Sequence, residues 1–225
     1  MKKKTEIKIS RSKIDLFIEC PRCFWLEVKH NIKRPEKFSS AHIGSKYDPL
    51  LKRIFDEHRK INKKPPELED LDFELYPDLN KLNIWRKGVE YYHPKHNITY
   101  YGKIDDLLIT KEKDLVPLDF KTTLSKDFNV YDSYKRELEI YGYFLRKQGE
   151  KVLDIGVLYF IRIDINEKFE KIEERKILTI ENLNYEIYDE ILENLKETYF
   201  SEKEPLPNPN CEFCKRDFEI IKLFK

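Results

Sequence analysis

The sequence lacks any run of apolar residues long enough to cross a membrane as a helix, which takes about 18 or more. Its lysine-rich start is not followed by the apolar core of a signal peptide, so we expect a cytoplasmic protein with no membrane partner. The Gly-x-x-x-x-Gly-Lys-[Ser/Thr] loop that binds nucleotide phosphates is also missing, so any motor would have to come from another chain. We find no internal repeat, and none of the five histidines has a spacing typical of metal ligands.

The chain has a net charge of only +1, but its charged residues are distributed unevenly. Residues 1–64 carry 18 Lys and Arg against 8 Asp and Glu, a net charge of +10, whereas the remainder carries 25 against 34, a net charge of −9. The asymmetry suggests a basic N-terminal surface for a polyanion, beside an acidic remainder that includes a metal site. Lysine runs that are simply solvated explain the same pattern, and on charge alone this is the better interpretation.

The pattern of apolar residues predicts both helices and strands in a chain of 225 residues, long enough to bury a substantial core. Helices are predicted at about 12–28, interrupted at Cys20-Pro21, and at about 42–60, 131–147 and 182–200. Strands are predicted near 72–76, 82–92, 100–109, 115–122, 152–165 and 171–180. This order indicates an α/β or α+β domain with a mixed central sheet.

Two of these strands, at 100–109 and 115–122, read as a hairpin that carries charge among apolar residues. A buried hairpin gains nothing from Asp105, Asp119 and Lys121, because burying unpaired charge is costly. Asp119 and Lys121 are two residues apart, so their side chains leave the same face of the strand. If Asp105 faces the same way, its carboxylate can share a divalent metal with that of Asp119. A surface hairpin with charges on its wet side is the alternative, but the nearly all-apolar strand around Asp119 favours a site.

The four cysteines form two Cys-x-x-Cys pairs, Cys20/Cys23 near the start and Cys211/Cys214 near the end. Each pair places two thiolates on one turn, and two pairs complete a tetrahedral metal site that would join the two ends of the chain. Disulfides are disfavoured without an export signal, and a redox pair would need only one motif. A structural metal is therefore predicted. Both Zn²⁺ and an iron–sulfur cluster use four thiolates, so the choice between them stays open.

Six stretches follow one another in the order of a known motif series: Ser12 to Leu26 with Cys20-Pro21-Arg22, Gly44-Ser45-Lys46-Tyr47-Asp48, Gly102-Lys103-Ile104-Asp105, Asp119-Phe120-Lys121-Thr122, Glu137-Leu138-Glu139-Ile140-Tyr141, and the closing cysteines. The series resembles the PD-(D/E)XK nuclease superfamily, and within it the RecB-like group that includes the CRISPR-associated adaptation exonucleases and the AddB-type helicase-nucleases. The resemblance spans nearly the whole chain.

The resemblance implies a restriction-endonuclease-like α/β fold, with a mixed central sheet flanked by helices. It implies one RecB-like nuclease domain over residues 1–225, made of a basic helical part at 1–64, a nuclease core at 70–200 and a cysteine segment at 205–225. The N- and C-terminal segments would meet at the four-cysteine site, which in this group usually holds a 4Fe–4S cluster.

The resemblance also implies metal-dependent hydrolysis of DNA phosphodiester bonds. Asp105 and Asp119 would hold Mg²⁺ or Mn²⁺ through hard oxygen ligands, with the backbone carbonyl of Phe120 as a further ligand. The metal would polarise the scissile phosphate, activate a water and stabilise the leaving oxygen. Lys121 would orient that water and offset the developing charge; a lysine among carboxylates keeps its proton, which favours this role over that of a general base.

The sequence departs from the group's pattern at three places. Asp48 stands where the group often has a metal-binding histidine, and it either binds metal or merely caps the helix before Pro49. Glu137 stands where the group has glutamine, and metal contact and solvent exposure are equally good interpretations. The cysteines divide two and two where the group usually has one and three, which keeps zinc open. Tyr141 is a candidate catalytic group, although its helical stripe favours a core position.

Phosphate contacts are assigned to four basic residues, Arg22, Lys29, Arg53 and Arg59, each of which also fits plain surface. We expect a deoxyribonuclease of repair, recombination or CRISPR adaptation, acting as an exonuclease or on single strands. Its expected partners are DNA that is single-stranded or has free ends, and a helicase or another repair or CRISPR subunit. The alternative is a non-catalytic, metal-stapled nucleic-acid-binding module or a subunit active only with partners.

Overall fold

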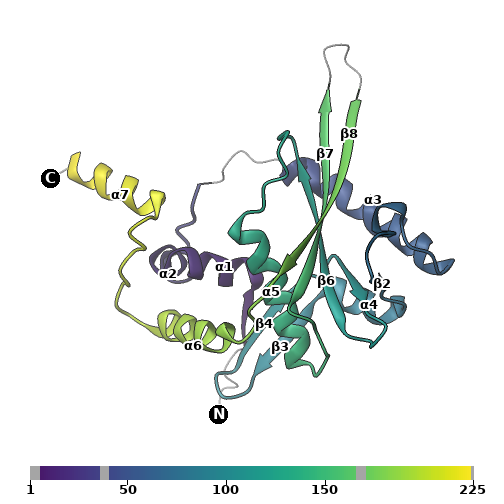
Figure 1. Ribbon diagram of the computed structural model, residues 1–225. Coiled ribbons are helices and arrows are strands. Elements are labelled where there is room, and N and C mark those ends of the chain that lie inside the picture. Colours follow the sequence, from purple (N-terminus) through teal and green to yellow (C-terminus); the bar gives the residue numbers. More distant parts are fainter. Residues whose placement is uncertain (1–5, 36–40, 166–170, 224–225) are drawn as a thin grey trace. The chain divides into compact units, whose positions relative to one another are not determined.

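The computed structural model describes residues 6–35, 41–165 and 171–223, apart from the side chains of 41–45, 165, 171–172 and 219–223. In chain order the elements (Figure 1) are β1 (Ile7–Ser10), α1 (Arg11–Glu19), α2 (Pro21–His30), α3 (Ala41–Lys60), the 3₁₀ turn η1 (Pro66–Leu68), β2 (Glu74–Leu75), α4 (Leu79–Lys87), β3 (Val89–His93), β4 (Ile98–Gly102), β5 (Asp106–Ile109), β6 (Leu115–Thr123), α5 (Asp132–Lys147), β7 (Ile155–Ile165), β8 (Lys171–Glu181), α6 (Ile187–Phe200) and α7 (Glu212–Leu223). Among the described residues, no helix is long and apolar enough to cross a membrane.

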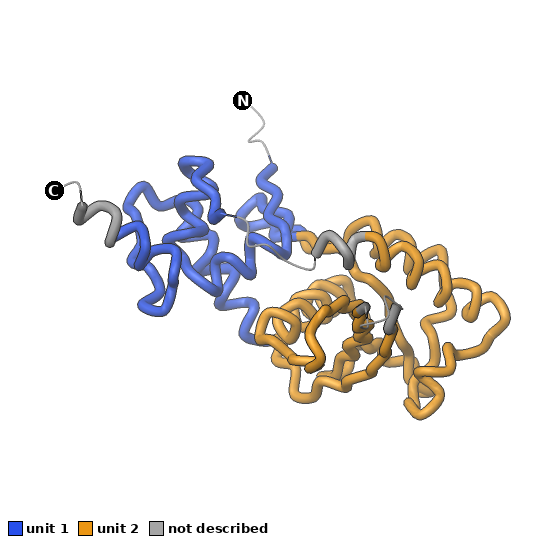
Figure 2. The backbone as a smooth tube through the Cα atoms, turned by 90° about the horizontal axis from the view of Figure 1, so that it is seen from above, with its two compact units in different colours: residues 1–37, 92–100, 186–225 blue, residues 38–91, 101–185 orange. Residues whose placement is uncertain are grey.

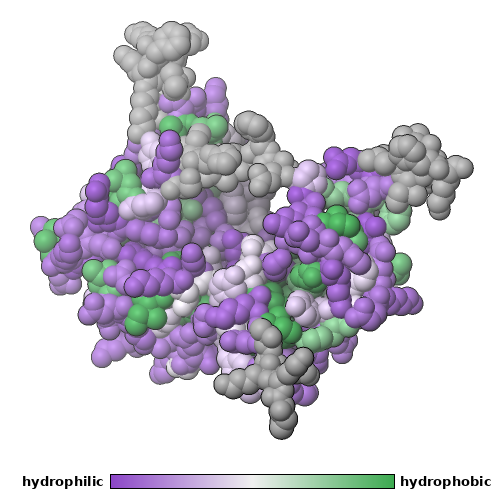
Figure 3. Space-filling view, turned by 180° about the vertical axis from the view of Figure 1, so that it is seen from behind, coloured by the Kyte–Doolittle hydropathy of each residue, from purple (hydrophilic) through white to green (hydrophobic). Residues whose placement is uncertain are grey.

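The chain forms two compact units, coloured separately in Figure 2. Unit 1 comprises residues 1–37, 92–100 and 186–225, and unit 2 comprises residues 38–91 and 101–185. Both ends of the chain therefore belong to the same unit. On the face shown in Figure 3 the surface is largely hydrophilic, with apolar side chains in separate patches. This agrees with a composition in which 38% of the residues are charged.

Unit 2 is built on a five-stranded sheet in the order β2-β5-β6-β7-β8. Strands β5 and β6 pair antiparallel, with Asp106 opposite Leu118, and β7 and β8 are antiparallel as well. Strands β6 and β7 pair in parallel, and α5 is the crossover between them, as parallel neighbours require. The mixed central sheet predicted from the sequence is confirmed, and so is the hairpin. Its first predicted strand, at 100–109, is in fact β4 and β5 separated by residues 103–105.

The two faces of β6 have different surroundings because side chains alternate along a strand. Leu118 and Phe120 point to one face, where they pack with Leu51 and Phe55 of α3 in a buried cluster. The rings of Phe55 and Phe120 meet edge to face, with centroids 5.0 Å apart. The intervening residues of β6 leave the opposite face, where α5 supplies the neighbouring side chains. Both faces of the sheet are thus buried, and Asp119 and Lys121 lie among apolar residues on the face that α5 covers.

The segment 82–92, predicted to be a strand, is a correction: it contains most of α4 and the start of β3. The side chain of Asp78 caps α4 by accepting a hydrogen bond from the Lys81 N–H over 2.9 Å. Leu82 and Trp85 are buried three residues apart, which is a helical spacing. The aromatic and β-branched residues of the run suggested a strand, but the cap and this spacing select a helix. Helix α7 was also not predicted.

Unit 1 contains α1, α2, α6 and α7. Cys20 is extended, with φ −164°, and Pro21 is the first residue of α2, so the predicted interruption of the first helix is confirmed. Asn31, in the left-handed region with φ 55°, ends α2. The indole N–H of Trp25 donates to the Ser201 carbonyl over 2.9 Å, which ties α2 to the segment after α6. A separate three-stranded sheet has the order β1-β4-β3.

Candidate active site and cysteine metal centre

Asp119 and Lys121 leave the face of β6 that α5 covers. Asp119 is buried, and its Oδ2 lies 2.5 Å from Lys121 Nζ, an ion pair that lacks hydrogen-bond geometry. Lys121 Nζ also donates to Glu137 Oε2 of α5 over 2.7 Å. The hydroxyl of Tyr141, one helical turn further on, donates to Glu137 Oε1 over 3.0 Å. The half-buried lysine is therefore held between a carboxylate of the sheet and one of the helix.

Asp105 lies in the short segment between β4 and β5, beside the middle of β6. Its Oδ2 accepts a hydrogen bond from the Phe120 N–H over 3.1 Å. This bond holds the Asp105 carboxylate beside the residue that follows Asp119 in β6. Its Oδ1 lies 2.9 Å from Lys52 Nζ of α3. Lys52 also bonds Asp48 Oδ2 over 2.8 Å, one helical turn earlier. The site is thus a line of four carboxylates, those of Asp48, Asp105, Asp119 and Glu137. Lys52 joins the first two, and Lys121 joins the last two.

Lys52 was not predicted as a site residue. One signal could have found it: it follows Asp48 by four residues within a predicted helix, so the two side chains share a face. Its contact with Asp105 joins residues more than fifty positions apart, which periodicity cannot reveal.

Burial and like charges shape the titration of this carboxylate line. Burial raises the pKa of Asp119 well above its ordinary value; Lys121 opposes this shift, and Glu137 and Asp105 add to it. Burial and the charge of Asp105 likewise raise the pKa of Asp48. Burial alone would lower the pKa of Lys121, but Asp119 and Glu137 raise it, so the ammonium form persists. The line carries more negative than positive groups, which is the environment of a cation site.

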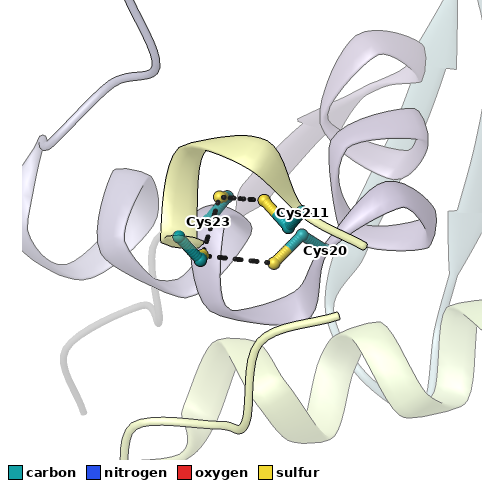
Figure 4. Close-up of side chains that lie close together, drawn as sticks. Cys20, Cys23 and Cys211 are labelled. Atoms are coloured by element: carbon teal, nitrogen blue, oxygen red, sulfur yellow. Dashed lines mark hydrogen bonds between the residues drawn. The ribbon is translucent and has the colours of Figure 1, made fainter. Parts of the chain in front are cut away.

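The cysteines gather in unit 1, from the start of α2 and from the start of α7 (Figure 4). The Sγ atoms of Cys23 and Cys211 are 3.6 Å apart, those of Cys23 and Cys214 also 3.6 Å, and those of Cys20 and Cys214 3.7 Å. All four sulfurs lie within 4.8 Å of one another and all four residues are buried. No other group of three or more His, Cys, Asp or Glu in the described part of the chain is this compact.

The surroundings of the sulfurs donate hydrogen bonds to them. Arg22 Nη1 donates to Cys214 Sγ over 3.5 Å, and Arg34 Nη2 donates to Cys211 Sγ over 3.7 Å. The Asn208 N–H donates to Cys20 Sγ over 3.4 Å. Such donors stabilise thiolates, which are the form that binds metal.

The Cys211 thiol ionises more readily than those of Cys23 and Cys214. Burial would raise its pKa, but hydrogen bonds from Cys214 and the neighbouring thiols lower it to about 7. Burial raises the pKa of Cys23. Four thiols with so many donors fit a bound metal or metal cluster better than an apolar core.

A family model described as the PD-(D/E)XK nuclease superfamily matches residues 67–217, which is 151 of the 225 residues. The chain belongs to this superfamily. Membership of a nuclease superfamily implies a nucleic-acid substrate and suggests a phosphodiesterase. The matched segment contains Asp105, Asp119, Lys121 and Glu137 but begins after Asp48. The family match therefore includes the candidate site residues of β6 and α5, and the contribution of α3 lies outside it.

Two solved structures are similar to this PD-(D/E)XK chain. One is the protein SSO0001, with 18% sequence identity and a TM-score of 0.46, covering 97% of this chain and 87% of that one. The other is a candidate exonuclease from Eubacterium rectale, with 16% identity and a TM-score of 0.48, covering 94% of this chain and 88% of that one. A search of curated proteins finds no match.

The hard-oxygen donor set of this PD-(D/E)XK site suits a divalent cation such as Mg²⁺ or Mn²⁺. Asp48 Oδ1 is buried without a hydrogen-bond partner, and Asp119 Oδ2 is buried in an ion pair with Lys121. An orphaned buried carboxylate oxygen costs free energy unless a cation or a proton satisfies it. The residues present therefore fit a metal. The Phe120 ring is on the opposite, apolar face, and the backbone of Phe120 lies at the site through its bond to Asp105.

The four basic residues assigned to phosphate contacts have different surroundings. Arg59 is buried and pairs with Asp106 over 2.5 Å and with Asp56 over 2.6 Å. Arg22 is buried beside Cys214 and pairs with Glu204. Lys29 lies 3.1 Å from the exposed Glu202, and Arg53 is exposed on α3. The contacts of Arg59 and Arg22 occupy their guanidinium groups within the fold.

Arg59 belongs to a buried ion network that supports the site. Arg86 of α4 joins it by pairing with Asp106 over 2.7 Å and with Asp56 over 2.8 Å. Arg86 Nε also donates to the Asp105 carbonyl over 3.0 Å. The network thus holds the backbone of a site residue, a positioning role that the sequence did not suggest for Arg59 or Arg86.

Proposed function

We propose that this chain is a metal-dependent nuclease of the RecB-like group that hydrolyses DNA phosphodiester bonds. One observation carries the proposal: Asp105, Asp119 and Lys121 lie together, Asp105 through the Phe120 N–H and Lys121 through its ion pair with Asp119. Two acids and a lysine at the central strand of a buried sheet are costly for folding and useful for phosphate chemistry.

Asp105, Asp119 and Asp48 would hold Mg²⁺ or Mn²⁺, which when bound supplies Lewis-acid stabilisation of charge on phosphate oxygens. The fixed positions of Asp105 and Asp119 orient the scissile phosphate across the edge of β6. The bond from the Phe120 N–H leaves Asp105 little freedom to rotate, so its carboxylate is preorganised before substrate arrives.

Lys121 acts electrostatically in this proposal. Its ammonium is held by two carboxylates that raise its pKa, so it does not release a proton readily at neutral pH. A fixed positive charge beside the phosphate offsets the negative charge that develops during hydrolysis, and the ammonium can orient the attacking water.

Glu137 and Tyr141 position Lys121 from the side of α5. Glu137 Oε2 accepts from Lys121, and Glu137 Oε1 accepts from the Tyr141 hydroxyl. Tyr141 is nearly buried, with 4% of its surface exposed, so we assign it a positioning role rather than contact with substrate. Glu137 remains close enough to the buried Asp119 to serve as a further metal ligand after a side-chain rotation.

The cysteine centre in this proposal holds one zinc ion. Four thiolates around a tetrahedral ion at a Zn–S distance of 2.3 Å lie about 3.8 Å from one another. Three of the sulfur–sulfur separations, at 3.6, 3.6 and 3.7 Å, are close to that spacing, and all four sulfurs lie within 4.8 Å of one another. An iron–sulfur cluster of four irons would have to be inserted between the sulfurs and needs a wider cage. The two-and-two division of the cysteines points the same way.

The test is cleavage of labelled single-stranded and double-stranded DNA with Mn²⁺ or with EDTA. Parent protein should cleave only with Mn²⁺, and Asp119→Ala should lower the rate by about 100-fold or more while retaining its fold. Asp70→Ala, which removes an exposed aspartate of unit 2, should cleave like the parent. End-labelled and circular substrates would separate exonuclease from endonuclease action.

Two results would overturn the proposal. Cleavage by Asp119→Ala at the parent rate would remove the assigned site. Metal-loaded, folded parent protein that binds DNA without cutting it, alone and with added partner fractions, would favour a nucleic-acid-binding module instead.

A further inference from the structure

A row of aromatic side chains lies beside Lys121, and the proposed catalysis does not use it. Tyr134 is in the first turn of α5, Tyr131 is the residue before α5, and Phe128 is in the loop after β6. The Tyr131 and Tyr134 rings meet edge to face at 5.3 Å. The Phe128 and Tyr134 rings both contact Phe160 of β7, at 5.8 and 6.1 Å. We refer to Phe128, Tyr131 and Tyr134 as the aromatic shelf.

The aromatic shelf is anchored in the core and open to solvent above. Phe160 is 1% exposed and supports the shelf from below, whereas Tyr131 is 56% exposed. Two further apolar side chains of the same segment, Val130 and Leu124, are also exposed. Single exposed apolar residues are ordinary, but several in one short segment beside a candidate active site indicate a binding surface.

The shelf is continuous with the proposed catalytic residues. Lys121 Nζ lies 4.6 Å from the centre of the Tyr134 ring, a cation–π contact. Together with the 5.3 Å step from Tyr134 to Tyr131, this places the Tyr131 ring within about 10 Å of the Lys121 ammonium. A nucleotide next to the scissile phosphate can reach that distance with its base.

The charges around the shelf suit a nucleic-acid strand. Lys176 of β8 lies over the Phe128 ring at 5.6 Å, and Lys126 in the loop is exposed. Asp127 and Asp132, also exposed, are the acids of the same segment. Alternating positive charges and rings are the usual composition of a surface that follows a phosphate backbone and stacks its bases.

We propose that the aromatic shelf stacks an unpaired base of single-stranded DNA next to the scissile phosphate. The inference rests on the proposed nuclease function and deepens it by assigning the residues that bind the base beside the scissile phosphate. Bases of a duplex are stacked on each other and cannot offer a free face to Tyr131, so the shelf selects single strands or frayed ends. Stacking accepts any base, so little sequence preference is expected.

The test is binding, measured by fluorescence anisotropy in EDTA so that it does not depend on catalysis. The two probes are a short labelled oligothymidylate and an abasic strand with the same number of phosphates. Parent protein should bind the base-bearing strand more tightly. Tyr131→Ala should weaken that binding about fivefold to tenfold and leave abasic binding unchanged. Tyr131→Phe, which retains the ring, should behave like the parent, and Phe128→Ala provides a second variant should Tyr131→Ala fail to fold.

The matched control is Ile61→Ala, which removes an exposed apolar side chain just after the C-terminal end of α3. It should change the affinity for neither probe. If Tyr131→Ala loses the same affinity for both probes, or none for either, the base-stacking role of the aromatic shelf is wrong. A change in oligomeric state without an effect on DNA would overturn it too and indicate a protein-binding face. Absence of Mn²⁺-dependent cleavage with base-dependent binding intact would instead reject the nuclease function and leave the base-binding surface standing.

Discussion

Lys52 of α3 lies 2.9 Å from the Asp105 carboxylate, beside the edge of β6. The same ammonium bonds Asp48, so one lysine is shared by two of the three aspartates proposed as metal ligands. Burial would lower the pKa of Lys52, but Asp105 and Asp48 raise it. The lysine thus supplies a positive charge where the proposed metal ion would supply one, and the two cations would compete for the same oxygens.

Lys52→Met should make the metal-free protein less stable and more responsive to metal. Losing the hydrogen bond to Asp48 and the ion pair with Asp105 should lower the free energy of unfolding in EDTA by about 1–2 kcal/mol. Because the competing ammonium is gone, Mn²⁺ should raise the Tm of Lys52→Met by more than it raises that of the parent. Thermal melts with EDTA and with a Mn²⁺ series measure both effects.

The matched control for this prediction is Lys60→Met, at the exposed end of the same helix, where Lys60 pairs with Glu57. It should leave the metal response unchanged. An equal Mn²⁺ shift for Lys52→Met and the parent would show that Lys52 does not compete for the site.

The raised pKa of Asp119 predicts that the stability of the metal-free protein depends on pH. Burial raises its pKa in the folded state above the ordinary value of 3.8, so the folded protein retains a proton that the unfolded chain releases. The free energy of unfolding should therefore fall as pH rises from about 4 through the raised pKa. Asp119→Asn should remove this loss and be more stable than the parent at neutral pH, by about 1 kcal/mol or more. Urea titrations in EDTA at several pH values would test it, and parallel pH profiles for the two proteins would contradict it.

The hairpin and the cysteine pairs could be predicted because their signals are local. Asp119 and Lys121 are two residues apart in an apolar strand, and two Cys-x-x-Cys motifs need each other to complete a tetrahedral site. Helix α5 was predicted because Tyr134, Leu138, Tyr141 and Leu145 follow one stripe, and the structure places it at Asp132–Lys147.

Other features depend on contacts that no local pattern reveals. Lys52 meets Asp105, and Arg86 meets Asp106, only after the sheet has formed. The segment of helix α4 was predicted to be a strand because Leu82, Ile84 and Trp85 suit either structure; the cap by Asp78 and the burial of Leu82 and Trp85 decide for a helix. The spacing of the cysteine sulfurs is likewise a property of the folded chain.

Metal removal should distinguish zinc from an iron–sulfur cluster. Protein purified without oxygen should contain about one zinc per chain and show no broad absorption near about 400 nm. A strong chelator should lower the Tm, and added Zn²⁺ should restore it, because metal binding contributes to folding. Cys211→Ser should have the same effect as the chelator, whereas Ser125→Ala, in the loop after β6, should not. Brown protein with iron and sulfide in stoichiometric amounts would contradict the zinc assignment.

Arg22→Gln should weaken metal retention by the cysteine centre. The Arg22 guanidinium donates to Cys214 Sγ and offsets the negative charge that four thiolates leave around a divalent ion. Removing such a supporting donor typically lowers metal affinity by about 10-fold to 100-fold. Competition with a coloured chelator measures the affinity directly. Arg216→Gln removes an exposed arginine of α7 and serves as the control. Equal zinc affinity of Arg22→Gln and the parent would limit Arg22 to its pairing with Glu204.

Gly142 of α5 should tolerate no side chain, because α5 packs there against the segment that leads into α6. A Cβ at this position would overlap the ring of Tyr185, whose hydroxyl donates to the Leu153 carbonyl over 2.6 Å and so holds the ring in place. Gly142→Ala should therefore lower the free energy of unfolding by about 1–3 kcal/mol, despite the better helix propensity of alanine. A Cβ at Gly88, which has an extended φ of 171°, meets nothing within 4 Å, so Gly88→Ala is the matched control. Urea unfolding measures both variants. If Gly142→Ala is as stable as Gly88→Ala, the Tyr185 ring can move and does not fix α5 at this point. If Gly142→Ala is less stable, Tyr185 holds α5, the helix that carries Glu137, in place.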